Sequence, residues 1–273
     1  MALDRPANPP DRPEVPDSVG VPADPHGVAN LTRAEAFKSH RYWSEVARFQ
    51  SAWDKIAERF PDRPESVERT EPDAGAAVTA ERQLALDKIS DREPAVSADM
   101  KDVEADAKSG GLLVGFEFRL KAMERLSQKV DERIRREPER DPAKILGTVH
   151  DAIRYTFCIP KESYAIGCDE VKGQLESRGY EMYHRRNSWS GSEYKGLNTR
   201  WITPDGQRFE VQFHTKESFH AKHDVTHLAY ERLRQPGVST AERQELSEFQ
   251  KLVSSYVPVP DGAQDISNFD RDI

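Results

Sequence analysis

The most informative stretch of the chain for chemistry runs from Arg208 to His214, where polar and apolar side chains alternate. Such alternation is typical of a β-strand that buries one face. The apolar side chains would enter a core, and Glu210, Gln212 and His214 would share the opposite face. If that face lines a cleft, the Glu210 carboxylate could hold Mg²⁺, which prefers hard oxygen ligands and bridges phosphates. The alternative is an ordinary strand with one face in water.

A second group of candidate residues is basic and precedes this strand in the chain. Arg119 is followed by Lys121, Arg125 and Lys129, and the last three are spaced four residues apart. On a helix, this spacing would place three cations on one stripe, where like charges repel by a few tenths of a kcal/mol per pair. We expect a polyphosphate to neutralise them, unless the stripe is a solvated face balanced by nearby acidic residues.

A third group lies in a loop of basic, small and aromatic residues between two expected strands. Arg185 and Arg186 at its start could bind phosphates, and Tyr194 or Trp189 could stack on a purine. The alternative is a surface hairpin loop, since loops collect such residues for other reasons.

Composition limits the classes of function. The 273 residues are 36% hydrophobic and 32% charged, so the apolar residues must be concentrated in part of the chain. A net charge of −8 argues against binding bulk nucleic acid over the whole surface, although a local basic pocket is compatible with it. No apolar run is long enough for a membrane span, and no signal sequence is expected. Two cysteines provide neither a disulfide framework nor a zinc signature, and Cys158 is expected to be a buried thiol.

The elements that must position these residues form an α+β pattern. We expect a mixed, mostly antiparallel sheet of about 4–5 strands flanked by helices, with an N-terminal helical extension. The chain divides into a disordered leader (1–30), a helical and linker region (31–110), the sheet domain (111–235), and a C-terminal helix with a polar tail (236–273). Expected strands cover 152–159, 180–184, 197–203 and 208–214, the last two joined by a turn at 204–206. Expected helices include a docking helix after Thr32 with an aromatic stripe, a charged helix over 80–107 broken at Pro94, a long helix over 112–136, and helices over 164–178, 217–234 and 240–256.

Several of these segments resemble, in order, the motifs of the RelA/SpoT homologue synthetase family, the alarmone synthetases. The basic segment beginning at Arg119 is similar to the ATP-binding segment of that family, and residues 151–156 resemble its aspartate-to-arginine first strand. Residues 194–198 resemble the segment whose tyrosine stacks on the acceptor base. Residues 210–215 resemble its Glu-Val-Gln-x-Arg-Thr strand, and the residues from Ala221 to Tyr230 resemble its next helix. The resemblance covers residues 115–232.

The resemblance implies roles for individual residues and a metal cofactor, Mg²⁺. Glu210 and Asp151 would be catalytic and would hold Mg²⁺, and Glu210 would also accept a proton from the attacking 3′-hydroxyl. The residues implied in binding the ATP phosphates are Arg119, Lys121, Arg125, Lys129, Arg154, Arg185 and Arg186. The residues implied in binding the acceptor are Tyr194, Lys195, Asn198, Gln212 and His214, with Tyr194 stacking on the base.

The implied activity is transfer of pyrophosphate from ATP to a nucleotide 3′-hydroxyl, giving (p)ppGpp- or (p)ppApp-like alarmones. Asn198 stands where the family has histidine and His214 where it has arginine. The acceptor therefore stays open among GDP, GTP, ADP, ATP and the 3′ end of a tRNA. The N-terminal part resembles the delivery region of a polymorphic toxin, which implies an exported effector acting in the cytoplasm and an immunity protein or antitoxin as partner. A non-catalytic module that binds nucleotide, or a partner through the helix around Trp43 and Trp53, is the remaining alternative.

Overall fold

The computed structural model describes residues 33–61, 76–121, 126–127, 136 and 149–271. Its centre is one sheet of six strands in the order β1-β2-β5-β4-β3-β6. Strands β2 and β5 pair in parallel, and every other neighbouring pair is antiparallel. The expected α+β class with a mixed, mostly antiparallel sheet is therefore confirmed. The strands are β1 (Leu112–Leu113), β2 (Arg154–Cys158), β3 (Glu181–Asn187), β4 (Leu197–Ile202), β5 (Arg208–His214) and β6 (Phe269–Asp270).

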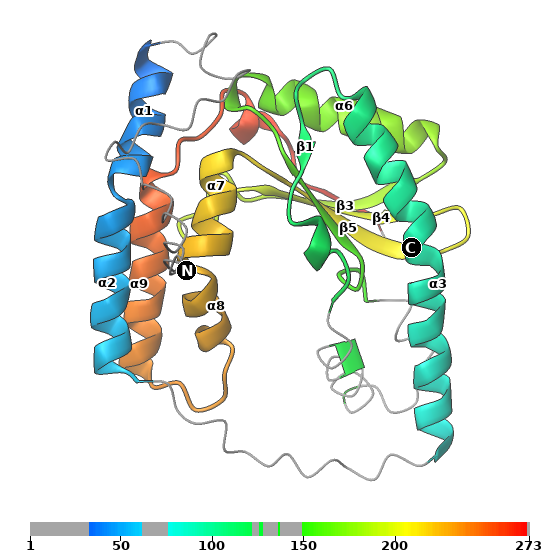
Figure 1. Cartoon of the computed structure of the whole chain (residues 1–273), viewed down its shortest axis with the longest axis horizontal. Helices are drawn as coiled ribbons and strands as arrows, with labels where there is room; N and C mark the ends of the chain where they lie inside the picture. The colour runs from blue at the N-terminus through cyan, green and yellow to red at the C-terminus, as the bar shows by residue number, and fades with distance from the viewer. Residues whose placement is uncertain (1–32, 62–75, 122–125, 128–135, 137–148, 272–273) are drawn as a thin grey trace, which may run out of the picture.

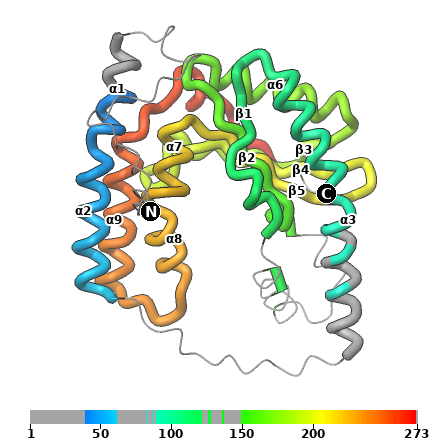
Figure 2. Tube along the Cα trace, viewed as in Figure 1, coloured from blue at the N-terminus to red at the C-terminus, as the bar shows by residue number. Residues whose placement is uncertain are grey.

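Helices flank the sheet in two groups (Figure 1). One group contains α3 (Ala76–Asp106) and α6 (Tyr164–Ser177), and α6 agrees with the expected helix over 164–178. In the other group, α1 and α2 lie beside α9, next to α7 and α8, and the tube in Figure 2 shows the same arrangement. The bounds of this second group are α1 (Arg33–Ser44), α2 (Val46–Arg59), α7 (Lys216–His220), α8 (His227–Leu233) and α9 (Thr240–Tyr256). Among the described residues, no helix combines the length and apolar character needed to span a membrane.

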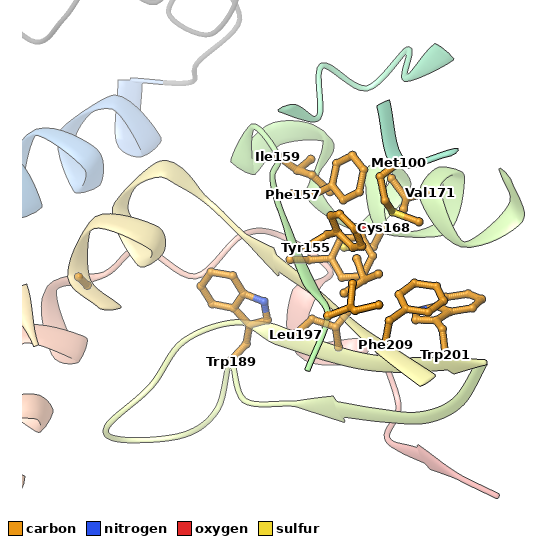
Figure 3. Close-up of a cluster of buried hydrophobic side chains, with 14 of the residues drawn as sticks. Met100, Tyr155, Phe157, Ile159, Cys168, Val171, Trp189, Leu197, Trp201 and Phe209 are labelled. Atoms are coloured by element: carbon orange, nitrogen blue, oxygen red, sulfur yellow. The ribbon is translucent and has the colours of Figure 1, made fainter. Parts of the chain in front are cut away.

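The core lies between the sheet and the first group of helices. Figure 3 shows Tyr155 and Phe157 of β2 gathered with Phe209 of β5, Met100 of α3 and Val171 of α6. These side chains are buried because the alternating pattern of each strand sends its large apolar residues to the same face. The expected hairpin between β4 and β5 is confirmed, with Gly206 at φ 87° in the turn where a left-handed residue is needed.

The aromatic stripe after Thr32 docks as expected, although it forms two helices instead of one. Tyr42 and Phe49 are fully buried, and the ring of Trp53 lies 5.7 Å from that of Phe249 on α9. The chain turns between α1 and α2 at Glu45, which is not part of either helix. Helix α3, the sheet and these docking helices share one hydrophobic cluster in the described part of the chain. The division at residue 110 stays a prediction.

Three expectations about local structure are wrong. The helix expected from Leu112 does not begin there, because Leu112 and Leu113 form the edge strand β1, which pairs with β2, and residues 116–118 form a short 3-10 turn. Gly110 and Gly115, at φ 78° and 60°, turn the backbone out of a helical path on each side of β1. Helix α3 continues through Pro94 because Val96 and Met100 beyond it are buried in the core, and this packing outweighs the lost backbone bond.

The third wrong expectation concerns the C-terminal residues, which are not simply a polar tail after α9. They cross the end of β3 and add β6 to its free edge. The Asn187 side chain donates 2.7 Å hydrogen bonds to the carbonyls of Ala263 and Ile266, and Arg185 donates to the carbonyl of Ser267 at 2.8 Å. These side chains satisfy the backbone of a segment that has few apolar residues to anchor it.

Candidate active site

A buried carboxylate lies between two arginines on the sheet face opposite the core; we call this the polar sheet face. Glu210 of β5 is aligned with Arg154 on one neighbouring strand and with Arg200 on the other. Directly opposed residues in neighbouring strands project to the same face with their Cβ atoms about 5 Å apart. Glu210 is only 8% exposed, so its charge requires such compensation. The sequence interpretation had given Arg200 no role, although it shares the alternation of β4 with Asn198.

A lysine and an amide fix one side of this carboxylate. The Lys222 ammonium donates to Oε1 of Gln212, and Nε2 of Gln212 donates to Oε1 of Glu210. This relay determines the orientation of the Gln212 amide, because its oxygen must face the lysine. Among the described residues, Oε2 of Glu210 has no hydrogen-bond partner, so this oxygen is left to receive a cation or a proton.

Lys222 reaches the sheet from a π-helical turn, η4 (Ala221–Val225), between α7 and α8. The N–H of Thr226 donates to the carbonyl of Ala221 at 2.8 Å, five residues back. The extra residue in this turn rotates the side chains that follow it by about 100° around the helix axis. Turns of the π type are frequent at functional sites. Burial lowers the pKa of Lys222 to about 7, and the positive charge of Arg154 acts in the same direction. No role for Lys222 was inferred from the sequence because the residues over 217–234 were expected to form one regular helix.

The predicted acceptor residues Tyr194, Asn198 and His214 form one hydrogen-bonded group. The Tyr194 hydroxyl donates to Oδ1 of Asn198 at 2.7 Å and lies 3.0 Å from Nε2 of His214. Nδ1 of His214 lies 2.9 Å from the Ser218 hydroxyl. His214 is fully buried, and this burial, followed by the charge of Lys222, lowers the pKa of its imidazole. This shift favours the neutral imidazole, and the ring fixes the Tyr194 hydroxyl through their contact.

The other loop residues are distributed differently. Lys195 donates to the carbonyls of Trp189 and Gly191 at 2.9 and 2.6 Å, so its ammonium is bound within the loop. Arg186 is exposed and is paired with Asn198 in the register, which places it on the polar sheet face, whereas Arg185 binds the C-terminal segment. The expectation that Trp189 stacks on a purine is wrong. Its indole is fully buried, with its ring 5.1 Å from that of Tyr164 and nearly perpendicular to it.

The basic segment is only partly within the described residues. Residues 119–121 run beside the start of β2, where Leu120 bridges Ile153. The Lys121 ammonium donates to the Asp151 carboxylate at 2.6 Å, and Arg119 pairs with Glu93 on α3. Of the predicted ATP-binding residues, Arg125 and Lys129 lie outside the described residues. Lys121 and Arg154 are thus brought to the same end of β2, while Arg119 binds an acidic partner of its own.

The carboxylates present fit a Mg²⁺ ion that is shared with a substrate. Mg²⁺ in phosphoryl-transfer sites is commonly held by one or two carboxylates and completes its shell with phosphates and water. Glu210 offers an oxygen without a partner among the described residues, and Asp151 offers a carboxylate already bound to Lys121. No group of three or more His, Cys, Asp or Glu side chains that could hold a metal ion is found in the described part of the chain.

Comparison with known proteins gives structural matches only. No protein-family model matches the chain, and no curated protein matches it. The complex between the Type VI effector Tas1 and its immunity protein contains a chain with 21% identity and a TM-score of 0.43, covering 62% of this chain and 94% of that one. Small alarmone synthetase 1 from Bacillus subtilis, bound to its product pppGpp, shows 14% identity and a TM-score of 0.39 over 65% and 92% of the two chains. The protein smu.1046c from Streptococcus mutans UA159 shows 13% identity and a TM-score of 0.37 over 69% and 91%. All three TM-scores are below 0.5.

Proposed function

We propose that the chain is an ATP-dependent nucleotide 3′-pyrophosphokinase. The observation that carries this proposal is Glu210, a buried carboxylate with one oxygen held by Gln212 and with Arg154 and Arg200 on either side in the sheet register. The resemblance of the surrounding motifs to those of the RelA/SpoT homologue synthetases supports the same activity. The products would be (p)ppGpp- or (p)ppApp-like alarmones.

In the proposed reaction, the oxygen of a 3′-hydroxyl forms a bond to the β-phosphorus of ATP. The bond between that phosphorus and the oxygen bridging to the α-phosphate breaks, and AMP leaves with the electron pair. The hydroxyl proton passes to the Glu210 carboxylate as the new bond forms. Phosphoryl transfer of this kind requires little covalent participation by the protein, so catalysis depends on alignment and on neutralising the developing charge.

The cations have distinct tasks in this proposal. Arg154 and Lys121, at the start of β2, would bind the phosphates of ATP, together with Arg186 from β3. Mg²⁺ held by Glu210 and Asp151 would neutralise phosphate charge when bound. The ring of Tyr194, fixed through Asn198 and His214, would orient the base of the acceptor. The positive charges are spread over several elements, and this suits a substrate with several phosphates better than one with a single carboxylate.

A toxic role and a protein antagonist extend the proposal. The effector Tas1 is known in complex with an immunity protein, and by analogy we propose that this chain acts in the cytoplasm of a target cell and has an inhibitory partner. In this proposal the chain would act as a toxin by draining ATP from the target cell, whichever acceptor is used.

A direct assay tests the activity. The protein is incubated with Mg²⁺, ATP labelled at the γ-phosphate, and separately GDP, GTP, ADP, AMP or bulk tRNA, and the products are then separated. We expect label on a nucleotide, accompanied by an equal amount of AMP from ATP. Release of labelled inorganic phosphate alone, or label on tRNA alone, would contradict the proposal.

A further inference from the structure

Four ring side chains lie next to one another beside the polar sheet face; three are close to parallel, and the fourth, Phe118, is tilted by 42°. We call Phe118, Phe219, His223 and His227 the ring platform. The rings of Phe219 and His223 are 5.2 Å apart and 14° from parallel, and those of His223 and His227 are 6.4 Å apart and 20° from parallel. The ring of Phe118 lies 5.4 Å from that of His223. The stack therefore joins the short turn η2 (Phe116–Phe118) to the helices that follow β5.

The ring platform borders the candidate active site on two sides. Phe219 packs on the buried His214, with 6.2 Å between ring centroids. His223 directly follows Lys222, whose ammonium is bound to Gln212 beside Glu210. Phe118 directly precedes the segment that carries Lys121 along the start of β2. A planar group resting on these rings would have the cations of the polar sheet face within reach of its substituents.

The outer members of the stack are open to solvent. Phe118 is 52% exposed, and His223 and His227 are also exposed. The Phe118 ring is tilted by 42° against that of His223 and exposes apolar surface on which a further aromatic group can pack. His223 is fixed in place because its Nδ1 lies 3.0 Å from the Asp224 carboxylate and its ring is stacked on both sides. The platform is therefore organised before any ligand arrives, which reduces the entropy lost on binding.

We propose that the ring platform stacks the base of a purine nucleotide whose phosphates lie on the polar sheet face. Charge complementarity selects this occupant, since Phe219 packs on His214, which lies close enough to Arg154 and Lys222 to feel their positive charges, and a nucleotide carries both a planar base and several negative charges. The inference rests on the proposed function and adds the residues that recognise the base. Either substrate, the ATP donor or the acceptor, has this chemistry, and an acceptor base on the platform would replace the contact proposed for Tyr194.

The test compares ligands that share phosphates and differ in the base. Binding of an ATP analogue with a methylene group between its α- and β-phosphates, of GDP and of inorganic tripolyphosphate is measured separately by calorimetry with Mg²⁺, so that no transfer occurs. We expect Phe118→Ala and His227→Ala to weaken binding of one of the two nucleotides by roughly 10-fold, the usual effect of removing a stacked ring. Tripolyphosphate binding should stay unchanged. Ile166→Ala, which removes a 71% exposed side chain from α6, is the matched control and should change none of the three.

Each outcome decides between the possibilities. Weaker binding of the ATP analogue places the donor base on the platform, and weaker binding of GDP places the acceptor base there. Unchanged nucleotide affinity in both variants, or an equal loss for tripolyphosphate, overturns the inference. Binding of a single-stranded oligonucleotide with no binding of either mononucleotide also overturns it. If the wild-type chain transfers pyrophosphate and the variants bind normally, only this inference fails, whereas failure of wild type to bind any nucleotide removes the proposed function as well.

Discussion

The substitution Gly196→Ala tests the packing next to Tyr194, which is predicted to stack on the acceptor base. A Cβ atom built at Gly196 would lie 2.8 Å from Cε1 of His214 and 2.9 Å from the Tyr194 hydroxyl oxygen. Contacts this short require one of the rings to move. His214 has little room to do so, because it is fully buried and its nitrogens meet Tyr194 and Ser218.

The expected change in the free energy of unfolding follows from these contacts. Forcing one methyl group into a filled site costs about 1–3 kcal/mol. A methyl at Gly173 on α6, by contrast, would meet no atom within 4 Å. Replacing a helical glycine by alanine in open space stabilises by roughly 0.5–1 kcal/mol. Gly173→Ala is therefore a matched control with the same chemical change and the opposite expected sign.

Urea unfolding followed by circular dichroism measures both variants. We expect Gly196→Ala to lower the free energy of unfolding by about 1–3 kcal/mol, and Gly173→Ala to leave it unchanged or raise it. The acceptor KM of the first variant should also rise, because Tyr194 is displaced. If Gly196→Ala is as stable as wild type while the control behaves as expected, the close contact among these three residues is refuted.

Two further predictions concern buried charges. Burial lowers the pKa of Lys222 to about 7 from the usual lysine value of 10.5, so the unfolded chain binds more protons than the native chain between these two pH values. The contribution of Lys222 to stability therefore rises with pH over this range. Urea unfolding at pH 7, 8 and 9 gives the free energy of unfolding of wild type and of Lys222→Met. The difference should shift in favour of wild type as the pH rises. A difference that does not change with pH would show that Lys222 is not buried as described. Arg232 and Glu242 form a buried ion pair between α8 and α9, so Arg232→Ala should lower stability by about 3–5 kcal/mol, and combined Arg232→Met and Glu242→Leu substitutions should lower it much less. Equal losses in the single and double variants would show that the pairing itself does not matter.

The sheet could be predicted from the sequence because its strands have a strong two-residue period. The run from Arg208 to His214 indicated both a strand and the face that Glu210 would occupy, and β5 has those bounds. The turn at Gly206 was equally local, since proline and glycine set its backbone angles. These features depend on residues within a few positions of one another, which is the range that pattern reasoning covers.

Features that depend on distant contacts could not be predicted in this way. Leu112 and Leu113 fit a helical pattern, yet they pair with Phe157 and Cys158, some 45 residues later in the chain. Lys222 points to Gln212 only because η4 is a π turn, and helical periodicity gives no sign of that extra residue. The residues around Trp189 have the composition of a binding loop, but the indole itself is buried against Tyr164. The roles assigned to Asp151 and to the acceptor residues stay predictions.

The most direct test of the account is the rate of pyrophosphate transfer from ATP by Glu210→Gln. This substitution keeps the size of the side chain and removes its charge. Glu176→Gln, on the exposed part of α6, removes a carboxylate elsewhere and is the control. We expect Glu210→Gln to lose transfer by about 10³-fold, with nucleotide binding retained and the control unaffected. A Glu210→Gln variant that transfers pyrophosphate at close to the wild-type rate would contradict the central claim that this carboxylate, set between Arg154 and Arg200, organises the reaction.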